Sequence, residues 1–230
     1  MPKKSYPKQL LVEGNNDRHV IWALCQKYEL PKTFSVEMPT EGEGIDAVFK
    51  TLPVKLRESK LETLGIVVDA DESKLKPLGI VVDADKNLEG RWQGIRDRLI
   101  AEGYDRRHIP KVVPTGGWIY DPSDRFLKKL GVWLMPDNQT SGMLEDFVAY
   151  LIPKGDLLEP EAKNILKDLE NRQLNHYALV HRPKAFIHTW LAWQKTPGMP
   201  MGQAMTARVL DSDREIARLF IGWLRNLFDL

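Results

Sequence analysis

The eight-residue string LGIVVDAD occurs twice in this chain of 230 residues, at 64–71 and again at 78–85. Each copy is a short apolar run rich in β-branched residues, which is typical of a buried strand in a parallel sheet. Each copy also ends in two aspartates that are one residue apart. Because open α/β sheets bind ligands at the carboxyl ends of their strands, the Asp-x-Asp pair indicates a divalent-metal site there.

The short spacing between the copies means that they cannot both be neighbouring parallel strands. Only residues 72–77 separate them, whereas a parallel connection needs a crossover of about a dozen residues or more. We expect the second copy to be the core strand, because a helical pattern over 90–102 follows it. The first copy is then an edge hairpin partner, a displaced loop or a recent duplication. On this interpretation Asp83 and Asp85 belong to the site, and Asp69 and Asp71 lie outside it.

Composition places the chain among ordinary globular proteins, with 43% apolar and 28% charged residues. No apolar stretch approaches the roughly 18 residues that span a bilayer, and the start has no secretory signal pattern. The lone Cys25 excludes an intramolecular disulfide and suits a reducing compartment, so we expect a cytoplasmic protein without a membrane partner. With a net charge of +1, the chain lacks the excess of basic residues typical of nucleic-acid binders. This weakens the case for nucleic-acid binding without excluding it.

Alternating strand and helix patterns predict an α/β fold with a mainly parallel sheet flanked by helices. We expect strands near 8–13, 34–38, 116–120 and 130–135, and helices near 18–28, 45–52, 90–102 and 142–152. After Pro160 the patterns are helical only, over 161–172, 184–194 and 213–228. The sequence therefore predicts an α/β domain over 1–155 and a helical extension over 156–230 that packs on it.

Acidic residues follow three of the predicted strands: Glu13, then Asp83 with Asp85, then Asp137. If these strands are parallel neighbours, their carboxylates converge at one edge of the sheet. Clustered oxygen ligands without thiolates suit Mg²⁺ or Mn²⁺, and a cation offsets the repulsion between the carboxylates.

The segment LLVEGNND, followed by a helix and then by GIVVDAD, resembles the toprim domain of bacterial primases, topoisomerases and overcoming-lysogenization-defect nucleases. The resemblance covers about residues 8–150. The later segments GVWLMPDN, SGMLEDF and KAFIHTWLAWQ are similar to an uncharacterised toprim-like family of small, stand-alone prokaryotic proteins. The resemblance implies that Glu13 is a general acid/base or metal ligand and that Asp83 and Asp85 hold Mg²⁺. It also implies that Glu145 or Asp146 is an additional acidic ligand.

These patterns favour Mg²⁺-dependent hydrolysis of a phosphodiester in nucleic acid or another phosphate-containing ligand. Lys184 is a candidate for stabilising transition-state charge, and ordinary surface exposure is its alternative. A P-loop and a dinucleotide-binding glycine pattern are absent from the sequence. Two other functions remain open: a non-catalytic toprim-like module that binds metal, nucleotide or nucleic acid within a larger assembly, and a structural partner. Tryptophans such as Trp22, Trp133 and Trp223 occupy apolar positions of the predicted elements, which favours core packing over base stacking.

Overall fold

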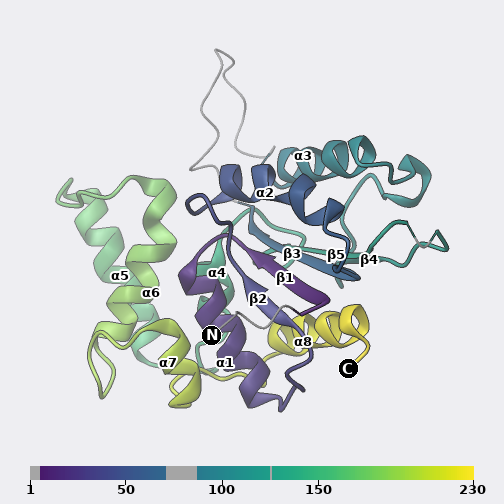
Figure 1. Ribbon diagram of the computed structural model, residues 1–230. Helices are drawn as coiled ribbons and strands as arrows, with labels where there is room; N and C mark the ends of the chain where they lie inside the picture. The colour runs from purple at the N-terminus through teal and green to yellow at the C-terminus, as the bar shows by residue number, and fades with distance from the viewer. Residues whose placement is uncertain (1–5, 71–86, 125) are drawn as a thin grey trace.

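The computed structural model describes residues 6–70, 87–124 and 126–230 and contains a five-stranded sheet (Figure 1). The strands are β1 (Lys8–Val12), β2 (Ser35–Glu37), β3 (Thr63–Asp69), β4 (Trp118–Tyr120) and β5 (Lys129–Met135). Their order is β2-β1-β3-β5-β4, and only the β4–β5 pair is antiparallel. The predicted α/β fold with a mainly parallel sheet is therefore confirmed.

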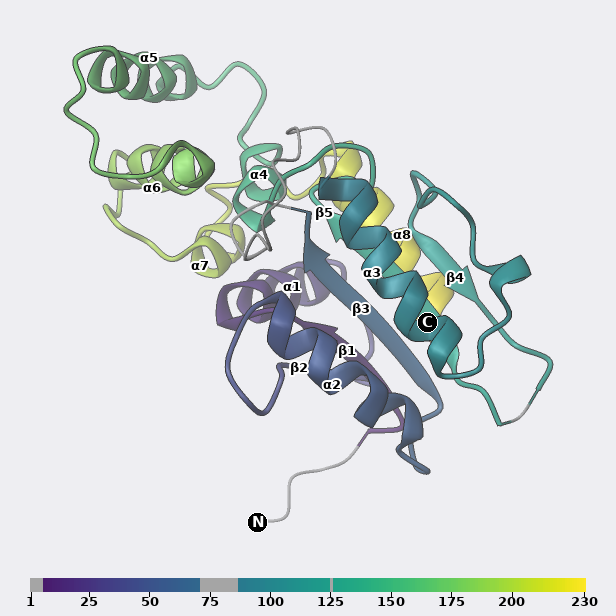
Figure 2. The same cartoon turned by 90° about the horizontal axis from the view of Figure 1, so that it is seen from above.

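Helices cover both faces of the sheet, as Figures 1 and 2 show. The helices of the α/β part are α1 (Asn15–Lys27), α2 (Ile45–Arg57), α3 (Asn87–Ala101) and α4 (Leu144–Ala149), and the later ones are α5 (Leu158–Asn171), α6 (Arg182–Ala192), α7 (Met201–Thr206) and α8 (Glu215–Phe228). Two short 3-10 turns span Arg106–His108 and Leu179–His181. Strand side chains alternate between two cores: Leu64, Ile66 and Val68 pack with α2 and α3, and Val67 packs with α1 and α8.

Two glycines let α8 approach the sheet closely. Gly65 of β3 and Gly131 of β5 are register partners, and both face Leu227 of α8. A Cβ atom would lie 2.8 Å from Leu227 Cδ2 at Gly65 and 2.7 Å from it at Gly131. The last helix is therefore part of the core of the sheet domain rather than a peripheral addition.

The central strand β3 is formed by the first copy of the repeat, so the expectation that the second copy is the core strand is wrong. Over Lys8–Val12 β1 pairs with β3, and β3 pairs with β5 along seven residues. A parallel crossover needs about a dozen residues or more, and the whole β3–β5 connection, which contains α3, meets that minimum. The helix α3 therefore need not follow β3 directly. The second copy, with Asp83 and Asp85, lies outside the described residues, as does Asp71.

The part of the chain after Pro160 is helical, and the structure shows no strand there. Helix α7 was not expected, because its residues follow a stretch rich in proline and glycine that indicates a loop. Within the ranges that the structure describes, no helix is both long and apolar enough to cross a membrane. Helix α2 continues through Pro53, beyond the helix expected near 45–52.

Candidate functional site

A polar cavity of about 170 Å³ lies where β1 and β3 end. Its lining residues come from the β1–α1, β2–α2 and β5–α4 junctions, the end of β3 and the first turn of α6: Glu13, Gly14, Asn15, Asn16, Asp17, Glu43, Gly44, Asp69, Leu144, Glu145 and Lys184. This is the carboxyl edge of a parallel sheet, the place where α/β folds bind ligands.

The carboxylates of Glu13 and Asp69 lie on neighbouring strands and are held by backbone groups. Glu13 follows β1, is 3% exposed, and accepts a hydrogen bond through Oε1 from the Asp69 N–H at 2.9 Å. Asp69 in turn accepts a hydrogen bond through Oδ1 from the Leu144 N–H at 3.0 Å, at the start of α4. These contacts fix both carboxylates at the strand ends, because each backbone donor belongs to a rigid element.

Three further acidic side chains line the same cavity: Asp17, Glu43 and Glu145. Asp17 and Glu145 are buried, and one oxygen each of Asp17 and Glu43 lies 3.5 Å from the position that a Cβ on Gly14 would occupy. Among the described residues that line the cavity, Lys184 is the one cation, with its Nζ 3.7 Å from Glu145 Oε1. Within the described part of the lining, five carboxylates therefore face one ammonium group, and a bound cation would offset their repulsion.

Residues at helix N-termini also line the cavity. Helices α1, α2 and α6 each contribute residues from their start or from the position just before it. The partial positive charge of a helix N-terminus favours anions, including the oxygens of a phosphate group. The cavity therefore combines oxygen ligands suited to a hard cation with groups suited to phosphate.

The donor set fits Mg²⁺ by chemistry, because it consists of carboxylate and amide oxygens without sulfur or imidazole. Across 6–70, 87–124 and 126–230, no three Asp, Glu, His or Cys side chains form a group that could hold a metal ion. Mg²⁺ commonly keeps several waters and binds proteins through one or two carboxylates, so Glu13 and Asp69 are the residues that would hold it.

Of the residues expected at the site, the structure brings Glu13, Glu145 and Lys184 to the cavity. Asp137 lies at a different cavity, where its Oδ1 accepts hydrogen bonds from Gln139 and Thr140. Asp146 caps the start of α4 through a 2.9 Å hydrogen bond from the Met143 N–H.

Sequence reasoning placed Asp69 outside the site and did not select Asp17 or Glu43. Asp69 lies beside Glu13 because the first copy of the repeat forms β3. The signal for Asp17 was present, since Glu13, Gly14 and Asp17 are adjacent to one strand end. Glu43 reaches the cavity from the Gly-rich turn before α2, for which we saw no site signal.

Comparison with known proteins identifies a family without a known activity. The family model described as "Protein of unknown function (DUF3226)" matches residues 7–76 and 72–229. No curated protein matches the chain. A solved structure of the C-terminal region of the Xanthomonas campestris pv. campestris OLD protein is similar at 14% identity and a TM-score of 0.42, with 97% of each chain covered.

Proposed function

The chain belongs to the DUF3226 family, whose function is unknown, and from its own site we propose that it hydrolyses phosphodiester bonds with the help of Mg²⁺. The observation that carries this proposal is the pairing of Glu13 and Asp69 at the ends of adjacent parallel strands, in a cavity that also holds Lys184. When bound, Mg²⁺ would polarise the phosphoryl group and lower the pKa of a water nucleophile.

The residues of the chain have separate roles in this proposal. Glu13 and Asp69 bind the cation, and the backbone N–H groups of Asp69 and Leu144 orient the two carboxylates. Lys184 offers positive charge to the phosphate oxygens, because its ammonium group lies beside the buried Glu145 and its side chain remains 47% exposed. The first turn of α1 also lines the cavity, and its backbone N–H groups are suited to phosphate oxygens.

A second candidate is a module of the same site that binds a metal or nucleic acid without cleaving it. Cleavage and binding must therefore be measured separately.

The test is a cleavage assay on end-labelled single- and double-stranded DNA and RNA, with Mg²⁺, with Mn²⁺ or with a chelator. We expect metal-dependent cleavage that Glu13→Gln abolishes. Asp69→Asn should also abolish it, and this variant is best made in a chain lacking residues 72–85, which retains a single copy of the repeat. Asp137→Asn is the matched control, because it makes the same carboxylate-to-amide change at another strand end outside the cavity.

Cleavage that persists in the chelator, or that is equal in Glu13→Gln and the unmodified protein, would refute hydrolysis at this site. Binding of metal and oligonucleotide without any turnover would favour the second candidate.

A further inference from the structure

The net charge of +1 hides an uneven distribution of charge along the chain. Residues 171–210 contain no Asp or Glu, although these two types make up 32 of the 230 residues, about one in seven. The same stretch contains five Lys and Arg residues, so it carries a net charge of +5 and the rest of the chain a net charge of −4. A local basic excess indicates a surface for anions that the net charge of the whole chain does not reveal.

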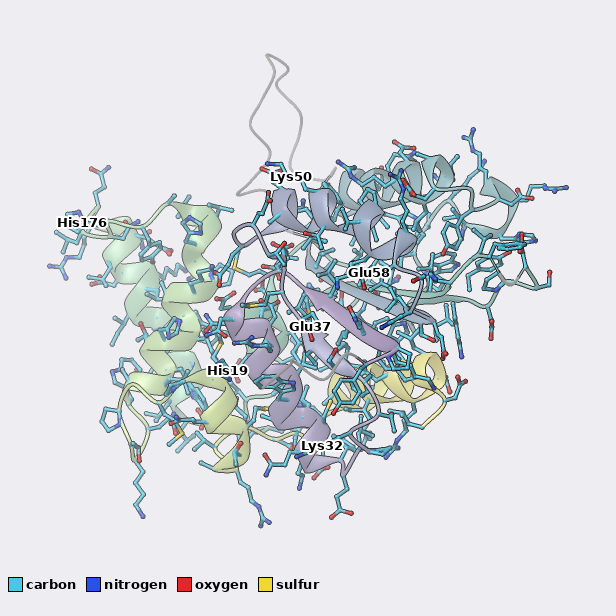
Figure 3. The ribbon with its side chains drawn as sticks, viewed as in Figure 1. His19, Lys32, Glu37, Lys50, Glu58 and His176 are labelled. Atoms are coloured by element: carbon cyan, nitrogen blue, oxygen red, sulfur yellow. The ribbon has the colours of Figure 1, made fainter. Side chains whose placement is uncertain are left out.

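This acid-free stretch includes helices α6 and α7 and lies at one end of the molecule. Figures 1 and 2 show α5 and α6 side by side there, at the opposite end from β4, and Figure 3 labels His176 at the outer end of this helical part. The first turn of α6 reaches the proposed catalytic cavity, where Lys184 Nζ lies 3.7 Å from Glu145 Oε1. The basic stretch and the cavity that would cleave a phosphodiester are therefore adjacent.

One face of α6 is exposed and leads away from the cavity. Lys184, His188 and Ala192 are exposed and are spaced by four residues, so they follow one another along the same side of the helix. Lys195, which follows the end of the helix, is also exposed. The helix packs into the core through its buried residues Phe186, Ile187, Trp190 and Leu191. We refer to Lys184, His188, Ala192 and Lys195 together as the α6 face.

Most carboxylates of the neighbouring helix α5 are already paired with cations. Three of its four acids form ion pairs: Glu159 with Lys163, Asp168 with Arg172 and Glu170 with Arg182. Across 6–70, 87–124 and 126–230, Lys195 forms no ion pair. The charge of Lys195 is therefore available to an anionic ligand.

We propose that the α6 face holds the sugar-phosphate backbone of a nucleic acid beside the cleaved bond, a proposal that rests on the proposed function. A nucleic-acid strand carries one phosphate per nucleotide, so the phosphates next to a bond in the cavity need a surface without competing carboxylates. Lys184 and Ala192 are eight residues apart on one helix, about 12 Å, which corresponds to about three to four nucleotides at about 3.4 Å each. The small side chain of Ala192 lets the backbone approach the helix.

The proposed recognition uses charge rather than stacking. The α6 face contains no Trp, Tyr or Phe, and Trp193 is five positions from His188, a spacing that places two residues on different sides of a helix. Trp22, for which the sequence predicted core packing, is 46% exposed, but it belongs to α1. The cavity that Trp22 lines also contains Glu29 and Glu37, which do not suit a phosphate backbone. We therefore expect binding at the α6 face to depend on salt and to be independent of base sequence.

The test places three different charges at one position of the α6 face. Fluorescence anisotropy of a labelled DNA strand of about twelve nucleotides, within the usual range of site sizes, is recorded with Mg²⁺ on proteins that all carry Glu13→Gln. Compared with Ala192→Gln, Ala192→Lys should bind about 1.5- to 5-fold more tightly and Ala192→Glu more weakly by a similar factor, the effect of one exposed charge pair. Both differences should shrink as the salt concentration rises from about 0.01 M to 0.15 M, because the screening length falls from about 30 Å to 8 Å.

Val54 is the matched control position, because it is exposed, at 62%, and lies in α2. The same three substitutions at Val54 should give equal affinities. Lys, Gln and Glu have similar helix propensities, so the fold should tolerate all of these variants. A second measurement uses Lys195→Gln, which should reduce the slope of log affinity against log salt by about 0.7, the value for one phosphate contact of a single strand, and Lys195→Arg should restore it.

Equal affinity of the three Ala192 variants, or equal responses at Ala192 and Val54, would overturn the proposal. Binding of phosphatidylserine vesicles that changes with the charge at position 192, while oligonucleotide binding does not, would assign the face to a membrane surface and would also overturn it. Failure of the proposed function is seen independently, in the cleavage assay on the unmodified protein. Metal-dependent cleavage with no effect of the charge at position 192 on affinity overturns the α6 face alone. Charge-dependent binding without cleavage supports the α6 face and overturns hydrolysis.

Discussion

Replacing Gly131 with alanine should destabilise the fold by about 1–3 kcal/mol, the usual cost of overpacking a core. The added Cβ would lie 2.7 and 2.8 Å from the two methyl carbons of Leu227 and 3.0 Å from Trp223 Cζ2. Carbon atoms pack best at about 3.5–4.0 Å, so the Leu227 methyl groups must shift. Both neighbours are buried, at 0% and 2% exposure, and have little room to do so.

A double-mutant cycle isolates the contact between Gly131 and Leu227. Leu227→Ala alone should cost about 2–5 kcal/mol, because it leaves a cavity in the core. In the double variant the new methyl group occupies part of that cavity, so we expect the combined cost to fall below the sum by about 0.5–3 kcal/mol. The measurement is the urea midpoint of each variant together with its thermal midpoint.

Gly222→Ala is the control for the glycine-to-alanine change itself. Gly222 lies in the same helix, α8, and a Cβ there meets no atom within 4 Å. We expect a gain of about 0.5–1 kcal/mol from helix propensity. A neutral Gly131→Ala variant, or strictly additive effects in the cycle, would refute the claim that this glycine sets the distance between α8 and the sheet.

Two further predictions concern the repeat and the single cysteine. Deleting residues 72–85 leaves one copy and shortens the β3–α3 connection from 17 residues to three, which should retain the fold by circular dichroism and stabilise it by up to about 1.5 kcal/mol; loss of the folded signal would show that the deleted residues are needed. Burial raises the pKa of the Cys25 thiol from 9.0 to about 12, so alkylation by iodoacetamide at pH 8 should be about a thousandfold slower than that of an unperturbed thiol. Alkylation of Cys25 in the native protein at the rate seen in the urea-unfolded chain would contradict the prediction about the thiol.

The order of strands and helices was predictable because each element carries its own period. The continuous apolar run of β5 indicates a strand that is buried on both faces, and the helical spacing in α3 and α8 reports which face of each helix is buried. The choice between the two copies of the repeat was not predictable in this way, because their eight residues are identical and local propensity is therefore the same. Only the pairing with β1 and β5 distinguishes them.

Asp137 shows that an acidic residue after a predicted strand does not by itself indicate a functional site. The Asp137 carboxylate accepts two backbone N–H groups and one hydroxyl from Gln139 and Thr140, so it serves the turn after β5. Aspartate followed by polar residues is a turn signal in the sequence as much as a ligand signal. A strand-end acid followed by a helix start, as at Glu13, is the better indicator of a site residue.

The difference in length between neighbouring strands explains why Glu13 belongs to both the fold and the site. Strand β1 ends at Val12, which pairs with Val67, whereas β3 continues to Asp69 alongside β5. Beyond the β1 ladder, the Asp69 N–H donates to Glu13 Oε1 at 2.9 Å. A side chain thus continues the hydrogen bonding of the sheet at the point where the backbone of β1 turns into α1.

This double role decides which variant can test the chemistry of Glu13. Glu13→Ala removes the acceptor of the Asp69 N–H and should cost about 1–3 kcal/mol of stability, so a loss of activity would not be specific. Glu13→Gln retains a carbonyl acceptor at the same position, so it should destabilise the fold less than Glu13→Ala does while removing the charge that a cation needs. Urea midpoints of the two variants check this, and equal destabilisation by glutamine and alanine would show that the charge of Glu13, rather than its acceptor oxygen, holds the end of β3.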